Sequence, residues 1–323
     1  MVTKNQARRG ANNDPVTGPQ APGHVSGFAS ILGRPNAGKS TLLNALVGSK
    51  IAIVSSKPQT TRTGIQAVLT RPEAQVVFLD TPGIHEAGKL IHKRMMEAVR
   101  EALNERDVLL YVCDASVPFE PADADAIKIL EGNQARRFLV LNKIDSVKSR
   151  HQILPLIETY RQTGLFEEFV PVSALTGEGL DELVRVVLTA LPEGPRYFPE
   201  DHLTDQPERF LAAELIREAA LETTRQEVPH AIAVLVDRWE DGARLLRLSA
   251  TVYVEREGQK KIVIGTGGQV LKRIGTAARQ QIEALLGRKC YLELFVKVRP
   301  GWRENSEFLN ELDWRYMAGG QSR

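Results

Sequence analysis

The most constraining feature of this chain is an eight-residue loop, residues 33–40, that satisfies the pattern G-x-x-x-x-G-K-S. An apolar run at 28–32 precedes it, and a helical pattern of apolar residues at 41–46 follows it. Glycines let the backbone wrap an anion, so that N–H groups and the start of the helix point at a phosphate. Lys39 adds a charge for the β- and γ-phosphates, and the Ser40 hydroxyl is placed to bind Mg²⁺. The loop predicts a nucleotide-binding site. From about residue 25 to 191, apolar strand patterns alternate with helical patterns, which predicts an α/β domain with a mixed, mostly parallel sheet and helices on both faces.

A second motif, Asp80-Thr81-Pro82-Gly83, follows the apolar run 76–79, which has the pattern of a buried parallel strand. Such a strand delivers an aspartate to the carboxyl edge of the sheet, where open α/β sheets bind their ligands. We expect Asp80 to hold Mg²⁺ through water and the Gly83 N–H to detect the γ-phosphate. Alone, an Asp before a Pro-Gly turn is ordinary loop chemistry. Its position after the phosphate loop makes it informative.

A third motif, Asn142-Lys143-Ile144-Asp145, closes the apolar strand 137–141 and determines which base is bound. The Asp145 carboxylate can accept hydrogen bonds from guanine N1–H and the 2-amino group. Adenine offers neither donor, and leaving the carboxylate unpaired can cost ~10⁴ in discrimination. Ser173-Ala174-Leu175 fits the remaining base-contacting loop. The predicted GTP-binding residues are Gly33, Arg34, Pro35, Asn36, Ala37, Gly38, Lys39, Ser40, Thr41, Asp80, Thr81, Pro82, Gly83, Asn142, Lys143, Asp145, Ser173, Ala174 and Leu175.

Between the first two motifs lies Gln59-Thr60-Thr61-Arg62, the candidate switch segment. Thr61 is the preferred threonine to bind Mg²⁺ in the GTP state, and Thr60 is the alternative. The predicted metal ligands are therefore Ser40, Thr61 and Asp80. Ile84 stands where Ras-like proteins place a glutamine that orients the attacking water, so we expect a GTPase with slow intrinsic turnover.

The composition fits two domains. The chain has 323 residues, and 42 Lys and Arg nearly balance 40 Asp and Glu. We expect a disordered tail at 1–24, a GTP-binding domain at 25–191, a proline-rich linker at 192–207, a second domain at 208–303 and a tail at 304–323. Two cysteines far apart in apolar segments, Cys113 and Cys290, predict reduced core residues in a cytoplasmic protein. No run approaches the length of a membrane span.

The second domain contains a short glycine motif, Gly265-Thr266-Gly267-Gly268, before a helical pattern at 269–286. This G-x-x-G loop is typical of a KH module, which binds single-stranded RNA. The stretch from residue 261 to 303 contains nine basic residues and only two acidic ones. Such an excess of positive charge is expected of a phosphate-binding surface. A flexible turn with a solvated basic helix is the alternative; a dinucleotide site would need glycine in place of Val270. The predicted RNA-binding residues are Gly265, Thr266, Gly267, Gly268, Lys272, Arg273 and Arg279.

With these motifs in order, the chain resembles the Era family of bacterial GTPases from about residue 25 to 303. The run 204–210, the segment Glu227-Val228-Pro229-His230 and the glycine loop contribute to the resemblance. It implies a GTPase domain followed by an α+β type II KH domain. It also implies a GTP-dependent assembly factor for the 30S ribosomal subunit that binds the 3′ end of 16S rRNA. Peripheral association with the inner membrane belongs to the same expectation. Nothing in the sequence demands a dimer, and we expect a monomer.

Two departures from the family pattern affect the RNA-binding end of the chain. Family members often carry a basic residue inside the glycine loop, where Thr266 and Gly267 are neutral. The acidic stretch from Glu304 to Asp313, with Trp314 and Tyr316, extends past the resemblance. We expect this stretch to form a surface helix that packs its aromatic side chains on the KH domain.

Similarity to cation-dependent GTPases of this class adds one hypothesis, that Asn36 helps hold a K⁺ ion in place of an arginine finger. The candidate catalytic residues are then Lys39, Asn36, Thr61 and Gly83. Three functional classes remain open: an RNA-binding ribosome-assembly GTPase, an RNA-modifying GTPase, and a membrane-associated signalling GTPase whose second domain binds a protein or lipid. The RNA-modifying class would need a catalytic module that the sequence does not reveal, and the first class is preferred.

Overall fold

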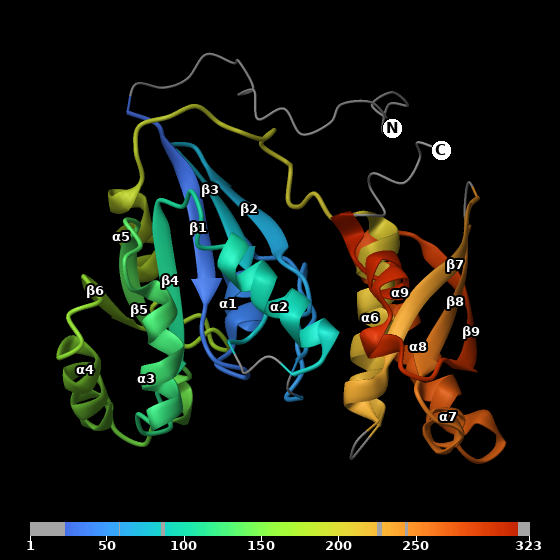
Figure 1. The fold of residues 1–323 in the computed structure, drawn as a ribbon. Coiled ribbons are helices and arrows are strands. Elements are labelled where there is room, and N and C mark those ends of the chain that lie inside the picture. The colour runs from blue at the N-terminus through green and yellow to red at the C-terminus, as the bar shows by residue number, and fades with distance from the viewer. Residues whose placement is uncertain (1–22, 58, 85–87, 225–227, 243–244, 316–323) are drawn as a thin grey trace.

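The computed structural model describes residues 23–57, 59–84, 88–224, 228–242 and 245–315. Almost all of the expected N-terminal tail, 1–24, lies outside these residues, as does the end of the expected C-terminal tail. Two sheet-containing bodies lie side by side, joined by a linker that crosses one end of both (Figure 1). The first carries a six-stranded sheet and the second a three-stranded sheet.

The first body, the G domain, has strand order β2-β3-β1-β4-β5-β6, in which β2 runs antiparallel to β3 and the other neighbours are parallel. This confirms the predicted mixed, mostly parallel sheet. Its elements are β1 (Val25–Leu32), α1 (Lys39–Val47), β2 (Ile65–Arg71), β3 (Ala74–Asp80), α2 (Leu90–Glu101), β4 (Val108–Asp114), α3 (Pro121–Ile127), β5 (Arg136–Asn142), α4 (Leu154–Arg161), β6 (Glu168–Pro171) and α5 (Leu180–Ala190).

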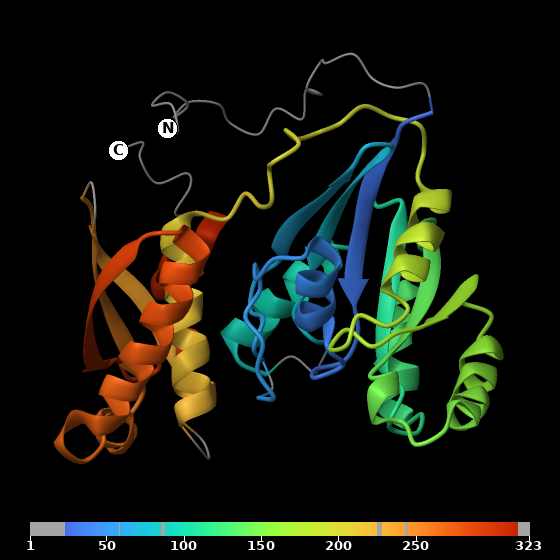
Figure 2. The same cartoon turned by 180° about the vertical axis from the view of Figure 1, so that it is seen from behind.

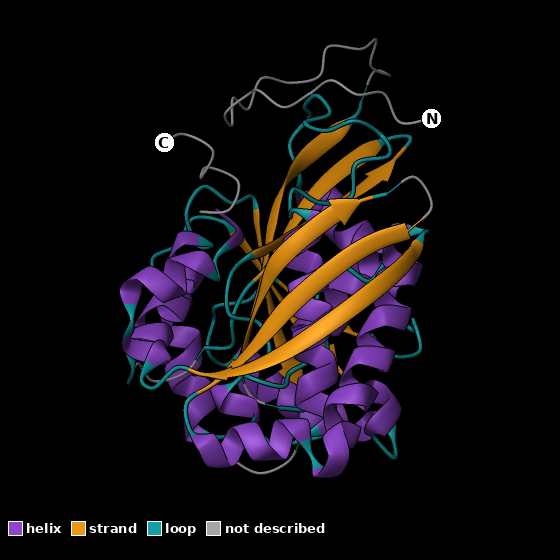
Figure 3. Ribbon diagram, turned by 90° about the vertical axis from the view of Figure 1, so that its right-hand side faces the viewer, coloured by secondary structure: helices purple, strands orange, loops and turns teal. Residues whose placement is uncertain are grey.

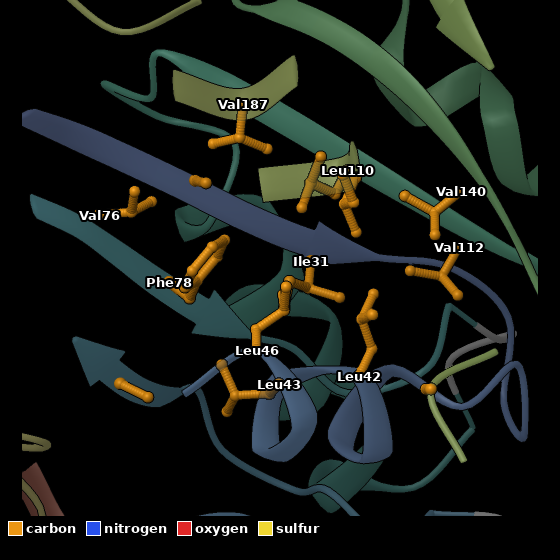
Figure 4. Close-up of a cluster of buried hydrophobic side chains, with 14 of the residues drawn as sticks. Ile31, Leu42, Leu43, Leu46, Val76, Phe78, Leu110, Val112, Val140 and Val187 are labelled. Carbon is orange, nitrogen blue, oxygen red and sulfur yellow. The ribbon is translucent and has the colours of Figure 1, made fainter. Parts of the chain in front are cut away.

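Helices cover both faces of this sheet, which is why its central strands are apolar along their length. Helices α1 and α5 pack on one face, and α2, α3 and α4 pack on the other. Figure 4 shows Leu42, Leu43 and Leu46 of α1 against Ile31 and Phe78 of the sheet. Burying each such side chain stabilises the fold by about 2 kcal/mol. These contacts fix the helix that follows the phosphate loop.

The strand register brings the sequence motifs to one edge of the sheet. In the parallel pair β1 and β3, Ile31 lies opposite Asp80. In the pair β4 and β5, Asp114 lies opposite Asn142. The phosphate loop, the Asp80 motif and the base motif therefore start at the same level.

The linker is bonded to strands β2 and β3 of the G-domain sheet. The Gln75 side chain accepts hydrogen bonds from the backbone of Tyr197 (2.7 Å) and Phe198 (2.9 Å). The Thr204 hydroxyl donates to the Gln66 carbonyl at 2.6 Å. The chain therefore enters the second body from a fixed position.

The second body has the order helix, strand, strand, helix, helix, strand, which is that of the predicted type II KH domain. Its elements are α6 (Glu208–Thr223), β7 (Ala233–Asp241), β8 (Leu245–Val254), α7 (Glu257–Ile264), α8 (Gln269–Leu286) and β9 (Lys289–Val298). The three strands lie in the order β7-β8-β9, with β8 and β9 parallel. Helices α6 and α8 cover one face, and Figure 3 shows the other face open toward the viewer.

Helix α7 is an element that the sequence analysis did not identify. Its last residues, 262–264, are an apolar run that leads into the glycine loop. The helix begins where the Gln259 side chain accepts hydrogen bonds from the backbone N–H groups of Glu255 (2.9 Å) and Arg256 (3.0 Å). This cap compensates for Gly258 in the first turn.

The expectation for the C-terminal stretch is wrong in part, because Phe308 and Trp314 make contacts that involve both domains. Tyr316 lies outside the described residues. On α9 (Ser306–Glu311), Phe308 packs edge-on against Tyr253 of β8, with ring centroids 4.9 Å apart. The same apolar cluster includes Ile91 and Met95 of α2 in the G domain. The Trp314 indole donates to the Gly64 carbonyl at 3.1 Å.

Two more sequence predictions concern the cysteines and the membrane. Cys113 and Cys290 are both buried free thiols. In the part of the chain that the structure describes, no helix combines the length and apolar character needed to span a bilayer.

Candidate nucleotide and RNA sites

The phosphate loop lies between the end of β1 and the start of α1. The buried Lys39 ammonium donates to the carbonyls of Gly33 (3.1 Å) and Arg34 (2.9 Å). Burial lowers the pKa of Lys39 to about 8, opposed by the nearby Asp80 charge. A phosphate that arrives here meets a lysine already inside the loop, and its negative charge would favour the protonated form.

Arg34 belongs to this loop through its backbone. Its guanidinium points to the neighbouring helix α3 and pairs with Glu120 and Asp123, both at 3.0 Å. Sequence reasoning missed this pair, which ties the loop to the other face of the sheet.

The three predicted metal ligands lie together. The Ser40 hydroxyl is 2.8 Å from the Thr61 hydroxyl and donates to Asp80 Oδ2 at 2.6 Å. The other carboxylate oxygen of Asp80, Oδ1, is buried and has no hydrogen-bond partner within the described residues. Burial raises the pKa of Asp80 to about 6, although the Lys39 charge and both hydroxyls favour its ionised form. Two hydroxyls and a carboxylate form an all-oxygen donor set that suits Mg²⁺.

The structure separates the two candidate switch threonines. The Thr60 hydroxyl donates to the Lys57 carbonyl at 2.7 Å, within its own segment. The Thr61 hydroxyl instead lies 3.3 Å from Asp80 Oδ2. This placement favours Thr61 as the magnesium ligand.

The turn after β3 passes very close to the phosphate loop. A Cβ on Gly83 would lie 2.7 Å from the Pro35 backbone nitrogen, so any side chain at residue 83 would push the two loops apart. The next residue, Ile84, donates its N–H to the Gly33 carbonyl at 3.0 Å, and its side chain packs into the apolar cluster on that face. Ile84 is therefore fixed away from any attacking water.

The base-binding loops are joined to the phosphate loop by one side chain. Asn142 donates to the Ala37 carbonyl (2.9 Å) and accepts from the Ala174 N–H (3.0 Å). The Ser173 hydroxyl donates to Asp145 at 2.5 Å, which lowers the pKa of that carboxyl. Asp145 is thus ionised and oriented, as guanine recognition requires.

Asp114 is a functional candidate that the sequence analysis missed. It ends β4, and it accepts a 2.6 Å hydrogen bond from the Lys143 ammonium. Burial favours a raised pKa for Asp114, but the hydrogen bonds from Lys143 and Ser116 outweigh it, and the pKa is lowered. The ion pair fixes the Lys143 stem that we expect to pack on the base. A signal existed, because Asp114 ends a buried strand at the same sheet edge as Asn142.

Residues of the phosphate loop and of the segment that carries Thr61 line one cavity of about 440 Å³. It is lined by Pro35, Asn36, Gly38, Lys39, Ser40, Thr41, Ile53, Val54, Ser55, Ser56, Gln59, Thr60, Thr61, Gly83 and Lys143. The cavity joins the phosphate loop to the switch segment and reaches the base motif at Lys143. Its charged lining and its size suit a nucleoside triphosphate.

The predicted RNA loop turns between α7 and α8. Gly265 has a φ of +72°, and a Cβ there would lie 2.3 Å from Val270 Cγ2. Thr266 and Gly267 are exposed at the tip, and α8 starts directly behind the loop. Lys272 and Arg273 are exposed on its first turns and form no ion pair within the described residues. Their charges are available to an incoming phosphate.

Other basic residues of this domain are already engaged. Arg279 pairs with Glu283 at 3.1 Å, and Glu283 also accepts from Lys289 at 3.2 Å. Arg288 pairs with Glu208 and Asp241, each at 2.9 Å. The count of nine basic residues therefore overstates the charge available to RNA, and Arg279 remains a weaker candidate than its neighbours.

Comparison with known proteins supports both halves of this description. A sequence family described as 50S ribosome-binding GTPase matches residues 28–143, and the KH domain family matches residues 227–303. GTPase Era of Geobacter metallireducens is 50% identical over 292 residues, 90% of this chain and 97% of that protein.

Two solved structures resemble the whole fold. A variant of Aquifex aeolicus Era bound to GDP·AlF4⁻ superposes with a TM-score of 0.87 at 43% identity, covering 90% of this chain and 99% of that one. An Era complex with MgGDPNP and nucleotides 1506–1542 of 16S ribosomal RNA gives a TM-score of 0.88, with the same identity and coverage.

The fold and the nucleotide site thus define a P-loop GTPase with a C-terminal KH domain. The sequence is 50% identical to GTPase Era of Geobacter metallireducens over 90% of this chain. The chain therefore belongs to the Era family of GTPases.

Proposed function

We propose that this GTPase assists assembly of the 30S ribosomal subunit and binds the 3′ end of 16S rRNA through its KH domain. The observation that supports this most directly is the exposed G-x-x-G loop with Lys272 and Arg273 free of ion pairs within the described residues. The Era complex described above holds an RNA from that part of 16S rRNA. Glycines bring the backbone close to RNA phosphates, and the two cations neutralise them.

The test is binding of a short single-stranded RNA that copies the 3′ end of 16S rRNA, with a scrambled RNA as control. Affinities are measured at one salt concentration with a non-hydrolysable GTP analogue and with GDP. Selective binding that strengthens with the GTP analogue is the expected result. Weak and equal binding of both RNAs would overturn the proposal and favour a membrane-associated switch with a protein or lipid partner.

A variant pair tests whether the glycine loop carries the binding. Changing both Lys272 and Arg273 to Ala should weaken RNA binding. It should also make the slope of log K against log salt concentration less steep, by about 0.7 for each lost phosphate contact with a single strand. Arg238→Ala is the control, because Arg238 lies on strand β7 and pairs with Glu240 at 2.9 Å. Equal losses in both proteins would mean that general charge, rather than the loop, governs affinity.

We also propose that Mg²⁺ is the resident metal, held by Ser40, Thr61 and Asp80 together with the nucleotide phosphates. When bound, it would neutralise charge on the β- and γ-phosphates. The buried Asp80 Oδ1, which has no hydrogen-bond partner in the part of the chain that the structure describes, supports this proposal. Chelation with EDTA should abolish GTP hydrolysis, and added Mg²⁺ should restore it. Full activity in EDTA would contradict the proposal.

A second cation, K⁺, is the proposed companion of Asn36. Asn36 lines the cavity. Its φ of +63° lies in the left-handed region, which asparagine adopts more readily than most residues. If K⁺ replaces an arginine finger, hydrolysis should be faster in K⁺ than in Na⁺ at fixed ionic strength. Equal rates would reject this role.

Cytoplasmic location, a monomeric state and peripheral contact with the inner membrane also remain proposals, supported by family membership. Flotation with vesicles of anionic lipid tests the last of them. Absence of the protein from the vesicle fraction would argue against direct lipid contact.

A further inference from the structure

The segment 53–64, which carries Thr61, is held mainly by side chains of the other domain. Among its described residues, the backbone forms no hydrogen bond with the backbone of the G domain. Two of its backbone groups are instead bonded by helix α6, since Arg217 donates to the Thr60 carbonyl and Glu218 accepts from the Val54 N–H at 2.7 Å. Figure 2 shows this loop on the side of the G domain that faces the KH domain.

The residue after Thr61 is held by the KH domain as well. The Arg62 guanidinium donates to the Ile232 carbonyl at 2.8 Å and lies over the Trp302 ring, 5.3 Å from its centroid. Trp302 is itself fixed, because its indole N–H donates to the Ala231 carbonyl at 2.9 Å. The residues on both sides of Thr61 therefore contact one body, while the Thr61 hydroxyl faces the metal ligands.

The two helix residues that make these bonds are themselves buried and paired. Arg217 is 2% exposed and is braced by Glu214, at 2.5 and 2.7 Å. Glu218 is 1% exposed and accepts a second hydrogen bond from Lys50 at 2.5 Å. Buried charges hold one geometry because a lost partner leaves a charge unpaired in a low-dielectric environment.

The G domain supplies few attachments of its own to this segment. The Gln59 side chain lies 3.1 Å from His92 of α2, and the Ser40 hydroxyl contacts Thr61. The Asn44 side chain fixes residues 51 and 52, just before the segment starts. Without helix α6, the Val54 N–H and the Thr60 carbonyl would lose the partners that fix them.

We infer that Arg217 and Glu218 of the KH domain are positioning residues for GTP hydrolysis. They hold the segment so that the Thr61 hydroxyl stays beside Ser40 and Asp80. They do not touch the reacting atoms, and their effect passes through the backbone of the segment. The KH domain then completes the GTPase site from within the same chain.

Arg217→Gln in the full-length protein tests this inference. Single-turnover hydrolysis at saturating GTP should slow about tenfold, the size expected when a hydrogen bond from a charged donor is lost. GDP affinity should stay within about twofold, because GDP lacks the γ-phosphate that this side of the site surrounds. Arg217→Lys should recover part of the rate, since it keeps a donor at this position.

Arg209→Gln is the matched control on the same helix. Arg209 donates to the Val236 carbonyl at 3.2 Å, within the KH domain. Its replacement should leave hydrolysis unchanged. The inference is overturned if Arg217→Gln hydrolyses GTP at the normal rate, if Arg209→Gln is equally slow, or if GDP affinity falls together with hydrolysis.

A second variant covers the case in which Arg217→Gln does not fold. Lys50 is 43% exposed, so Lys50→Gln removes the partner of Glu218 and leaves the core contacts of α6 intact. Hydrolysis should slow severalfold, again with GDP affinity preserved. An unchanged rate in this variant would also overturn the inference.

Discussion

The two sides of the nucleotide cavity differ in what holds them in place. The base-binding side is held within the G domain, where Asn142 joins it to the phosphate loop and Asp114 fixes the Lys143 ammonium. The side that carries Thr61 depends on buried side chains of α6 in the KH domain. A part of the site that binds every guanine nucleotide is thus built on one rigid core. The part expected to respond to the γ-phosphate is attached to the domain expected to bind RNA.

This difference predicts two kinds of variant. Changes on the base side should weaken GDP and GTP binding equally, because both nucleotides carry the same base. Changes on the switch side should slow hydrolysis and leave GDP affinity nearly unchanged.

Asp145→Asn should have the largest effect. An amide replaces one acceptor with a donor that faces the guanine 2-amino group, so affinity for GDP and GTP should both fall by about 10³-fold. Xanthine carries an oxygen at that position, and xanthosine nucleotides should bind the variant better than guanosine nucleotides do. Titration with fluorescent nucleotide analogues measures both. Preserved GTP binding would remove Asp145 from base recognition.

Thr61→Ala should act on the switch side alone. Loss of the hydroxyl beside Ser40 and Asp80 should slow hydrolysis by about 10²-fold, with GDP affinity nearly constant. Thr60→Ala is the control, since the Thr60 hydroxyl bonds Lys57 instead. A slower Thr60→Ala protein would show that the threonine assignment is reversed.

Asp114→Asn should show the uniform effect expected of the base side. The Lys143 ammonium would lose a charged partner at 2.6 Å, and affinity for GDP and GTP should fall together by about tenfold. Asp125→Asn provides a control, because Asp125 pairs with Lys128 on the exposed surface. A selective loss of GTP binding would break the proposed division between the two sides.

Much of the fold was predictable because short stretches of sequence, the apolar strands and the motifs that follow them, determine it locally. The apolar strands that end in the phosphate loop and in Asp80 and Asn142 determine a parallel sheet, and parallel strands place their carboxyl ends at one edge. The G-x-x-G loop predicted the KH domain in the same way. Helix α7 was missed because Gly258 weakens its pattern, while its start depends on the Gln259 cap.

The contacts between the domains could not be read from local patterns. Arg62 reads as an exposed cation in a loop, yet it lies over Trp302, more than two hundred residues later in the chain. Arg217 lies on a helix that reads as an ordinary amphipathic element of the KH domain. Pairing of residues so distant depends on how two finished domains meet, and a single sequence carries no periodic signal for it.

Trp314→Phe should give the smallest effect. It tests the hold on Gly64, the last residue of the segment 53–64 that carries Thr61. The substitution keeps an aromatic ring but removes the N–H that donates to the Gly64 carbonyl at 3.1 Å. Loss of one neutral hydrogen bond costs about 1 kcal/mol, so hydrolysis should slow by about fivefold at most, with GDP affinity unchanged. Trp239→Phe is the matched control, because Trp239 is partly buried and packs against the KH core. If Trp239→Phe slows hydrolysis equally, the effect comes from the stability of the KH domain and not from its hold on the segment before β2.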